Sequence, residues 1–424
     1  MTESLQNDTR LQRRYRAERR FRAYGLAATA AGLLFLGVIL VSILMLGHSA
    51  LRQSFVRLDI AFDPEVLQTG GKTDEASLRY ADYQALIRVA MREKFPDVTG
   101  RREMKELYAL VSSGAADVLS DALISDPGLI GQRRVYWLPA SDDMDLFVKG
   151  EISSDTPEIE RQLTGRQIEW AERLTAEGAV DLRINTAFFT SGDSREPELA
   201  GIWGAVKGSF YTLLVTLALS FPAGIMAAIY LQEFAPKNTL TDLIEVNINN
   251  LAAVPSIVFG LLGLAVFLNF FQMPRSAPLV GGVVLALMTL PVIIIAARAA
   301  LLAVPPSIRE AALAVGATPM QTVFHHVAPL ALPGMLTGAI IGMARALGET
   351  APLLMIGMVA FIADIPQGVT DPATVLPVQI FIWADSPERA FMAKMAAGIL
   401  VLLGFLIAMN LLAVLLRRRF EQKW

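Results

Sequence analysis

The chain has 424 residues, of which 54% are hydrophobic and 18% are charged, and soluble domains usually carry more charge. It has no cysteine, which excludes disulfides, thiolate metal sites and a cysteine nucleophile. Its three histidines offer little for a catalytic metal site or a Ser-His-Asp triad. The formal net charge of −3 is spread unevenly. We therefore expect a non-enzymatic chain with no catalytic residue, no metal and no cofactor.

An arginine-rich segment, residues 1–24, begins the chain. Its seven arginines stand against three acidic residues; they are Arg10, Arg13, Arg14, Arg16, Arg19, Arg20 and Arg22. Such a run beside a first span holds that end in the cytoplasm, although a basic tail also suits nucleic acid. Its place directly before an apolar stretch favours the topological role, and the basic tail 417–424 agrees with it.

Six apolar stretches follow, at about 25–47, 203–230, 248–271, 278–302, 334–362 and 392–416. A spanning helix needs roughly 20 apolar residues to cross about 30 Å of hydrocarbon. The sequence therefore predicts an all-α polytopic membrane protein with six transmembrane helices and both termini in the cytoplasm. The first stretch is too long for the apolar core of a signal peptide, although Gly47 and Ser49 leave cleavage open as an alternative.

Residues 48–200 have the composition of a soluble domain, with 18 Lys and Arg against 27 Asp and Glu. Apolar residues recur three and four apart near 77–95, 101–123 and 157–177, and an alternating pattern covers 180–188. We expect a small inserted α+β domain, which is periplasmic if the N-terminus is cytoplasmic. The sequence leaves its role open between docking another protein, supporting a second membrane subunit and passive insertion.

A short string in this domain, Gly70-Gly71-Lys72-Thr73, looks like the end of a phosphate-binding P-loop. The full pattern needs another glycine five residues before Gly71, and Val66 stands there. We interpret the string as a flexible turn. Any ATP hydrolysis must then come from a separate subunit.

The loop 303–333 lies between the fourth and fifth stretches, inside the segment 201–416 that holds the last five stretches. Pro305 and Pro306 suit the end of one helix and the start of another. Ser307 is the expected N-cap, with Glu310 as its capping-box partner, and Gly316 is expected to end the helix in the left-handed conformation. The loop therefore predicts a short helix on the cytoplasmic side.

Glu310-Ala311-Ala312, Gly316 and the later Val327-Ala328-Pro329 resemble the EAA motif of ABC importer permeases. Val327 and Ala328 depart from the consensus Ile and Leu. In that family the motif forms the coupling helix that docks into the ATPase subunit. The resemblance implies that the ATPase-coupling residues are Arg309, Glu310, Ala311, Ala312 and Gly316. The alternative is an ordinary amphipathic loop helix.

The fifth stretch carries Gly334, Gly338 and Gly342 at a spacing of four. Small residues at this spacing let helix backbones approach closely. We expect a packed interior helix at this place rather than one that faces lipid.

Arg345 and Glu349 lie within the same stretch, four residues apart and thus on one helical face. About 16 Å of helix separates Arg345 from Gly334, which places the arginine near mid-membrane. A charge there costs at least about 2.5–3.5 kcal/mol, which favours a polar pathway for an anion. The planar fork of arginine suits phosphate, and Glu349 would hold the arginine or accept a proton. The alternative is a structural ion pair.

The string from Ala344 to Leu354 resembles the phosphate permeases PstA and PstC, and its Thr-Ala-Pro-Leu-Leu ending is similar to PstA. The segment 253–260 also resembles them, with Pro255 as a kink, and the resemblance covers about 185–415. It implies that the substrate pathway is formed by Arg345, Glu349, Thr350 and Arg298. Molybdate and sulfate permeases share the start of the string, so another oxyanion is the alternative substrate.

The resemblance implies a permease subunit of an ATP-driven phosphate importer in the bacterial inner membrane. The implied partners are a second permease (PstC type), an ABC ATPase dimer (PstB type) and a periplasmic phosphate-binding protein (PstS type). A link to a phosphate-sensing histidine kinase is left open. A secondary transporter would predict inverted repeats, and a sensor would predict a cytoplasmic signalling module; we find neither pattern in the sequence.

Overall fold

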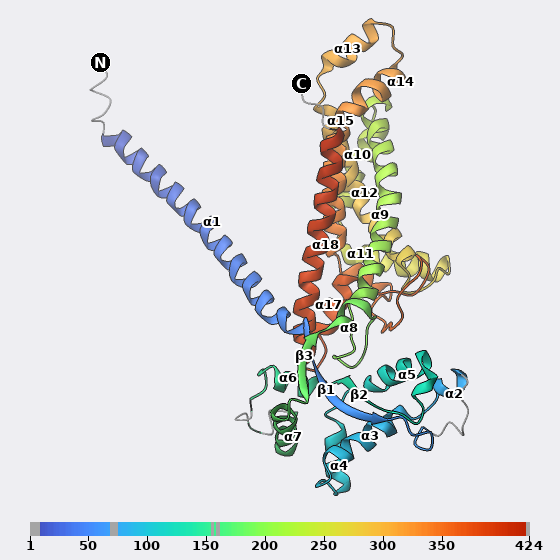
Figure 1. The fold of residues 1–424 in the computed structure, drawn as a ribbon. Helices are drawn as coiled ribbons and strands as arrows, with labels where there is room; N and C mark the ends of the chain where they lie inside the picture. Colours follow the sequence, from blue (N-terminus) through green and yellow to red (C-terminus); the bar gives the residue numbers. More distant parts are fainter. Residues whose placement is uncertain (1–8, 68–74, 154–156, 158–161, 421–424) are drawn as a thin grey trace.

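The computed structural model describes residues 9–67, 75–153, 157 and 162–420, so Gly70–Thr73 lie outside the described residues. Long helices form one part of the molecule, and a small sheet with short helices forms the other (Figure 1). The elements up to the second long helix are α1 (Thr9–Ala50), β1 (Arg52–Ala61), α2 (Glu75–Arg79), α3 (Tyr83–Lys94), α4 (Arg101–Tyr108), α5 (Ala115–Ser125), β2 (Arg133–Pro139), α6 (Asp142–Val148), α7 (Gly165–Ala176), β3 (Val180–Ile184) and α8 (Thr186–Thr190).

The remaining elements form a helical core, the region 201–416 that is predicted to be the permease core, and the last helix continues to Phe420. They are α9 (Trp203–Ile229), α10 (Thr239–Ala252), α11 (Ser256–Leu262), α12 (Pro278–Leu302), α13 (Pro306–Ala314), α14 (Pro319–Gln321), α15 (Ala328–Gly348), α16 (Ala351–Met355), α17 (Leu376–Ala384) and α18 (Ala390–Phe420). Turns of π-helix extend α9 through Phe234 and α11 through Phe270, and another π-helical turn joins α14 to α15.

The inserted domain is built on a three-stranded antiparallel sheet in the order β2-β1-β3. Alternate residues of the central strand β1, namely Val56, Leu58 and Ile60, are fully buried. They form one core with side chains of α3, α5 and α7, because successive strand residues point to opposite faces and only one face is covered. The small α+β domain expected from the sequence is present.

Two of the three strands were not predicted. The alternating pattern near 180–188 became β3, which ends at Ile184 and is followed by α8. Neither β1 nor β2 was predicted. β2 begins Arg133-Arg134 and only its last residues are buried, so its sequence shows no clear alternation. The helical segment expected at 101–123 is two helices, α4 and α5, separated by the turn that precedes Ala115.

Five described helices are long and apolar enough to cross a membrane: α1, α9, α12, α18 and the helix that ends in α15. The predicted third span is not straight. It starts earlier, at Thr239, and the chain bends by 101° between α10 and the segment Ser256–Phe270. The break falls at residues 253–255, where Pro255 is the N-cap of α11. If this bent pair counts as one crossing, the total is six.

Close helix contacts hold the helical core together. α12 lies between α9 and α15 and makes its most extensive contacts with these two helices. A Cβ added at Gly338 of α15 would lie 2.3 Å from the Cβ of Ala296 on α12, so only glycine allows this approach. Gly334 lies in the same way against Ala300, and Gly342 lies beside Ile293 and Thr289.

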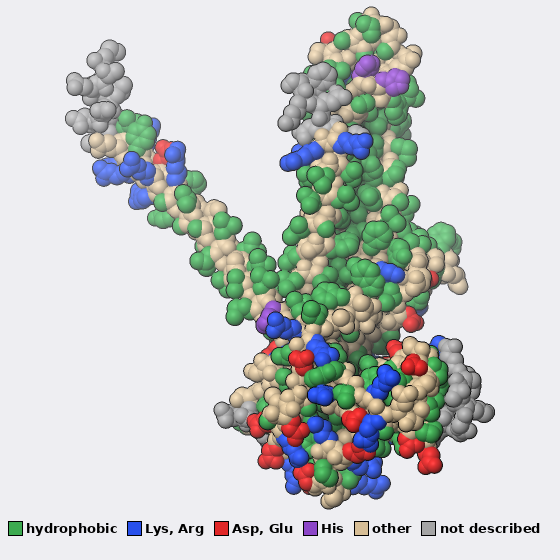
Figure 2. All heavy atoms as spheres, viewed as in Figure 1, with side chains coloured by type: hydrophobic (Ala, Val, Ile, Leu, Met, Phe, Trp, Pro, Cys, Tyr) green, Lys and Arg blue, Asp and Glu red, His purple; other side chains and the backbone are tan. Residues whose placement is uncertain are grey.

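The two ends of the molecule differ in charge and composition. The start of α1 and the end of α18 lie at the end opposite the sheet domain, with α13 and α14 (Figure 1). Arginine and lysine side chains gather at both helix ends, whereas the sheet domain carries mixed charges (Figure 2). α1 stands away from the other helices and meets α18 near the domain, where Gly47 lies against Ala396 and Ala397.

Candidate functional site

The helix α13 projects beyond the ends of the long helices (Figure 1). Its N-cap is Pro305, with no side-chain cap, so the predicted capping box of Ser307 and Glu310 is wrong. The two prolines start the helix instead. The first N–H group of a helix has no partner within the helix, and proline suits this position because it has no N–H. The predicted end is confirmed: Gly316 has φ +91°, and its N–H donates to Leu313 O at 3.0 Å.

Arg309 anchors α13 to the rest of the chain. Its Nη2 lies 2.6 Å from Glu233 Oε1, and its Nε donates to the other carboxylate oxygen at 3.2 Å. Its guanidinium also donates to the carbonyl oxygens of Val304 and Leu301, at 2.8 and 2.9 Å. One side chain therefore joins α13 to the last turn of α12 and to the end of α9. The geometry gives Arg309 a positioning role behind the surface of the loop.

Other parts of the loop point outward. Glu310 and Ala311 are exposed, whereas Ala312 is buried. Four apolar side chains extend the exposed surface, with exposed fractions from 49% to 84%; they are Leu313, Val315, Met320 and Phe324. Apolar side chains around a projecting helix make a surface suited to another protein.

Arg345 lies in the last turn of α15, which ends at Gly348. The predicted fifth span at 334–362 is therefore wrong in its second half. Glu349 is the C-cap with extended backbone, and Thr350 precedes the short helix α16. Glu349 still reaches back to the arginine, and the distance from Arg345 Nε to Glu349 Oε1 is 3.5 Å.

Arg345 is held loosely and faces outward. Its side chain is 44% exposed, and that of Glu349 is 19% exposed. The neighbouring Gly342 lies beside Thr289, near the middle of the 25-residue helix α12, which places the arginine well inside the apolar part of the core. A charge at such depth is costly against lipid. It therefore points to a polar pathway or another subunit on this face.

Arg298 lies elsewhere. Its Nη2 is 2.6 Å from Glu245 Oε1 of α10, and both side chains are less than one third exposed. At 1.5 Å per residue, Arg298 is about 13 Å along α12 from Thr289, toward α13. The structure thus brings Arg345, Glu349 and Thr350 together and leaves Arg298 apart, as a tie between α12 and α10.

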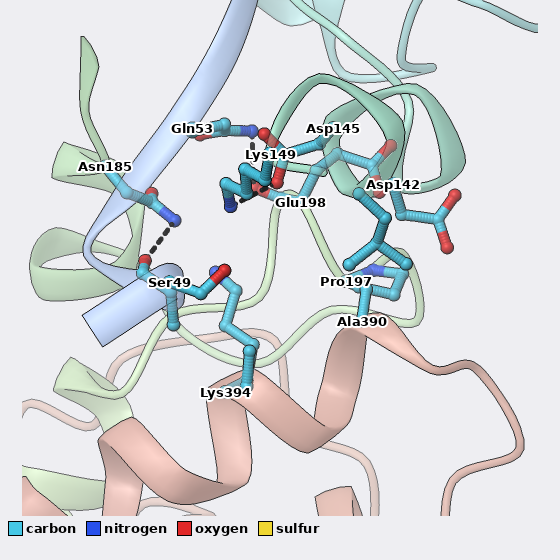
Figure 3. A pocket seen from close by; sticks show the side chains of 13 residues that line it. Ser49, Gln53, Asp142, Asp145, Lys149, Asn185, Pro197, Glu198, Ala390 and Lys394 are labelled. Atoms are coloured by element: carbon cyan, nitrogen blue, oxygen red, sulfur yellow. Dashed lines mark hydrogen bonds and ion pairs between the residues drawn. The ribbon is translucent and has the colours of Figure 1, made fainter. Parts of the chain in front are cut away.

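A junction of buried polar groups joins the inserted domain to α18. Lys394 is 5% exposed, and its ammonium group donates to Ala200 O at 2.9 Å. It borders a cavity of about 20 Å³ shared with Lys149, Asp145 and Glu198 (Figure 3). Burial raises the pKa of Glu198 to about 7, although a hydrogen bond from Ser112 lowers this pKa in part. Asp193 also crosses the junction and accepts a hydrogen bond from Trp383 Nε1 at 3.2 Å.

Sequence reasoning missed the acidic partners of the arginines. Glu233 lies in the π-helical turn that extends α9, and Glu245 lies within α10. Both fall between two predicted apolar stretches, where charged residues are common, so neither gave a prediction. The junction residues Lys394 and Glu198 were also missed. The available signal was a lysine inside an apolar stretch that begins near Ala390.

Two family comparisons divide the chain. The family described as binding-protein-dependent transport system inner membrane component matches residues 220–422. A domain of unknown function, DUF3333, matches residues 8–158. The second match covers α1 and most of the inserted domain, to which it gives no activity.

Several known proteins are similar to the second half. The probable ABC transporter permease protein YqgI of Bacillus subtilis is 34% identical over 41% of this chain, and the match spans 58% of YqgI. The phosphate transport system permease protein PstA 1 of Mycobacterium tuberculosis is 30% identical over 51% of this chain and 70% of its own length. An inward-facing structure of the MetNI methionine ABC transporter covers 52% of this chain at 18% identity, with a TM-score of 0.40.

Proposed function

Because the chain belongs to the binding-protein-dependent transport system inner membrane components, as an ABC importer permease of the PstA type, we propose that it carries phosphate across the bacterial inner membrane. The proposal includes cytoplasmic termini and a periplasmic domain at 48–200. A second permease of the PstC type would complete the pathway, a PstS-type protein would deliver phosphate, and a PstB-type ATPase dimer would drive transport.

One observation carries the substrate proposal: a loosely paired arginine, Arg345, is exposed within the apolar part of the helical core. Arg298 and Arg309 are each committed to a glutamate of another helix, at 2.6 Å in both pairs. Arg345 has a 3.5 Å contact and 44% exposure, so its guanidinium is available to an anion. A guanidinium can donate two parallel hydrogen bonds to two phosphate oxygens. Glu349 would orient the guanidinium of Arg345 and make release of the phosphate possible.

The test is phosphate uptake by the assembled transporter in vesicles. Arg345→Gln should abolish uptake while the subunits still purify together, and Arg345→Lys should retain part of it because the charge remains without the fork. Arg298→Lys is the matched control, which should transport nearly as well as the parent. Normal phosphate uptake by Arg345→Gln would contradict the role of Arg345 as a phosphate ligand. Competition by excess molybdate or sulfate would instead favour another oxyanion.

The ATPase would dock on α13 and the exposed apolar side chains around it. Here Glu310 faces outward while Arg309 fixes the helix from behind. Glu310→Arg should leave ATP hydrolysis running without transport, whereas Glu310→Gln should have a smaller effect. Tight coupling in Glu310→Arg would mean that the ATPase docks elsewhere.

A further inference from the structure

An apolar groove of about 210 Å³ opens on the permease core between α9, α15 and α18. Its side walls run from Leu336 to Met343 on α15 and from Leu416 to Met409 on α18, and Phe221 of α9 closes part of it. All of its lining side chains are apolar except Asn410. Seven residue steps separate the two ends of each wall, which gives a groove about 10 Å long along the helices.

Three consecutive arginines stand at one end of this groove. Arg417 follows Leu416 of the lining directly, and its Nη1 donates to Thr337 Oγ1 at 3.2 Å, so the guanidinium bridges α18 and α15 at the groove mouth. Its Nε has no hydrogen-bond partner among the described residues. Arg418 and Arg419 are exposed, and basic side chains gather at this end of α18 (Figure 2).

The other end of the groove lies deeper in the apolar part of the core. Met343 and Met409 line it there, about two helical turns from the arginines. The walls remain open, since Leu412 and Leu416 are 60% and 48% exposed. The arrangement is thus amphipathic along its length, with three cations at the membrane surface and an apolar trough that leads inward.

We propose that this groove is a binding site for an anionic phospholipid, with the phosphate headgroup on Arg417–Arg419 and one acyl chain between α15 and α18. Charge complementarity selects this occupant, because a neutral apolar helix would leave the arginines at the mouth without a counter-charge. Basic pockets between transmembrane helices bind anionic headgroups in this way. The site is separate from the pathway at Arg345 and does not depend on which solute is transported.

The test uses the full chain in vesicles that contain phosphatidylglycerol with a photoreactive group in its acyl chain. We expect labelling of peptides from 336–343 and 409–416, with competition by unlabelled phosphatidylglycerol and not by phosphatidylcholine. Each of Arg417→Gln and Arg419→Gln should lower labelling about fivefold, since a basic residue near an anionic surface contributes about 1 kcal/mol. Ala413→Phe should fill the groove, whereas Leu411→Phe, on an exposed neighbouring position, should leave labelling unchanged.

Two results would overturn the proposal. Equal labelling by a phosphatidylcholine probe, unaffected by the arginine substitutions, would reduce the groove to ordinary lipid-facing surface. Protection of both peptides in the transporter assembled with its partner subunits would mean that a protein segment covers the groove. The two glutamine variants keep the test valid if Ala413→Phe fails to fold.

Discussion

The helical core and the inserted domain hold their charged side chains in opposite ways. In the domain, ion pairs such as Arg133 with Glu93 lie on the surface, with about half of each side chain exposed. In the core, Arg298–Glu245 and Arg309–Glu233 join separate helices and are less than one third exposed. An apolar surrounding makes an unpaired charge costly. The two buried pairs therefore fix helices to each other, whereas the loosely paired Arg345 marks a candidate site.

This difference explains why the charged residues of the helical core say more about function than those of the inserted domain. Arg345 stands out because its neighbours in the core are apolar and its contact with Glu349 is loose. No single charge stands out on the described surface of the domain. The exception is the junction with the core, where Glu198 and Lys394 are each 5% exposed.

Removing Arg309 should have the largest effect on stability. Arg309→Gln leaves Glu233, which is 10% exposed, without its counter-charge and frees the carbonyl oxygens of Leu301 and Val304. Breaking a buried pair in this manner costs about 3 kcal/mol. Thermal melting of the purified chain should show it as a clearly lower midpoint. Glu310→Gln, one residue away and exposed, is the control and should melt like the parent.

The junction should make stability depend on pH. The pKa of Glu198 is raised to about 7 from the usual 4.5, so the folded state binds its proton more tightly than the unfolded state. Stability should therefore be greatest near pH 4.5 and fall as the pH rises to 7, by about 3 kcal/mol at most. Asp143, raised to about 6 by burial and by Asp142, contributes in the same direction.

Glu198→Gln separates the two contributions. The variant should lose most of the fall in melting midpoint between pH 5 and 7, while Asp143→Asn should remove only a smaller part below pH 6. An unchanged pH profile in Glu198→Gln would show that the carboxyl is not buried as described.

A third prediction concerns packing instead of charge. Gly338→Ala brings a methyl group to 2.3 Å from Ala296 and should cost about 1–3 kcal/mol through overpacking. Combining it with Ala296→Gly should restore most of the loss, because the pair exchanges one methyl group across the contact. Gly404→Ala on α18 has nothing within 4 Å and should be neutral or slightly stabilising. Additive losses in the double variant would contradict the contact.

The sequence predicted the permease core well because long apolar runs and proline positions act locally. Gly316 illustrates this: its left-handed conformation just after α13 was predicted from the preference for glycine at helix ends. The chain bends by 101° at the place where Pro255 was expected as a kink. The end of α15 at Gly348 was not predicted, because apolar residues resume after Thr350. Periodicity cannot distinguish a bent or interrupted span from a straight one.

The candidate site was predictable only in part. Arg345 and Glu349 were found because charges inside an apolar run are rare. Arg309 was expected at the docking surface, yet its partner Glu233 lies 76 positions away, and nothing local signals such a pairing. The same holds for the strand β1, whose partners β2 and β3 are distant in sequence, so its cross-strand neighbours could not be inferred.

The smallest effect is expected in the inserted domain, and it completes the comparison. Arg133 contacts Asp59 and Glu93 at 3.5 and 3.0 Å, with its side chain 52% exposed. Water competes for all three groups, so Arg133→Gln should change stability by no more than about 0.5 kcal/mol. The melting midpoint of the variant should also change slightly less with added salt than that of the parent, because one screened interaction is gone. A loss as large as that of Arg309→Gln would mean that burial does not separate the two regions, and that the domain's surface charges are structural after all.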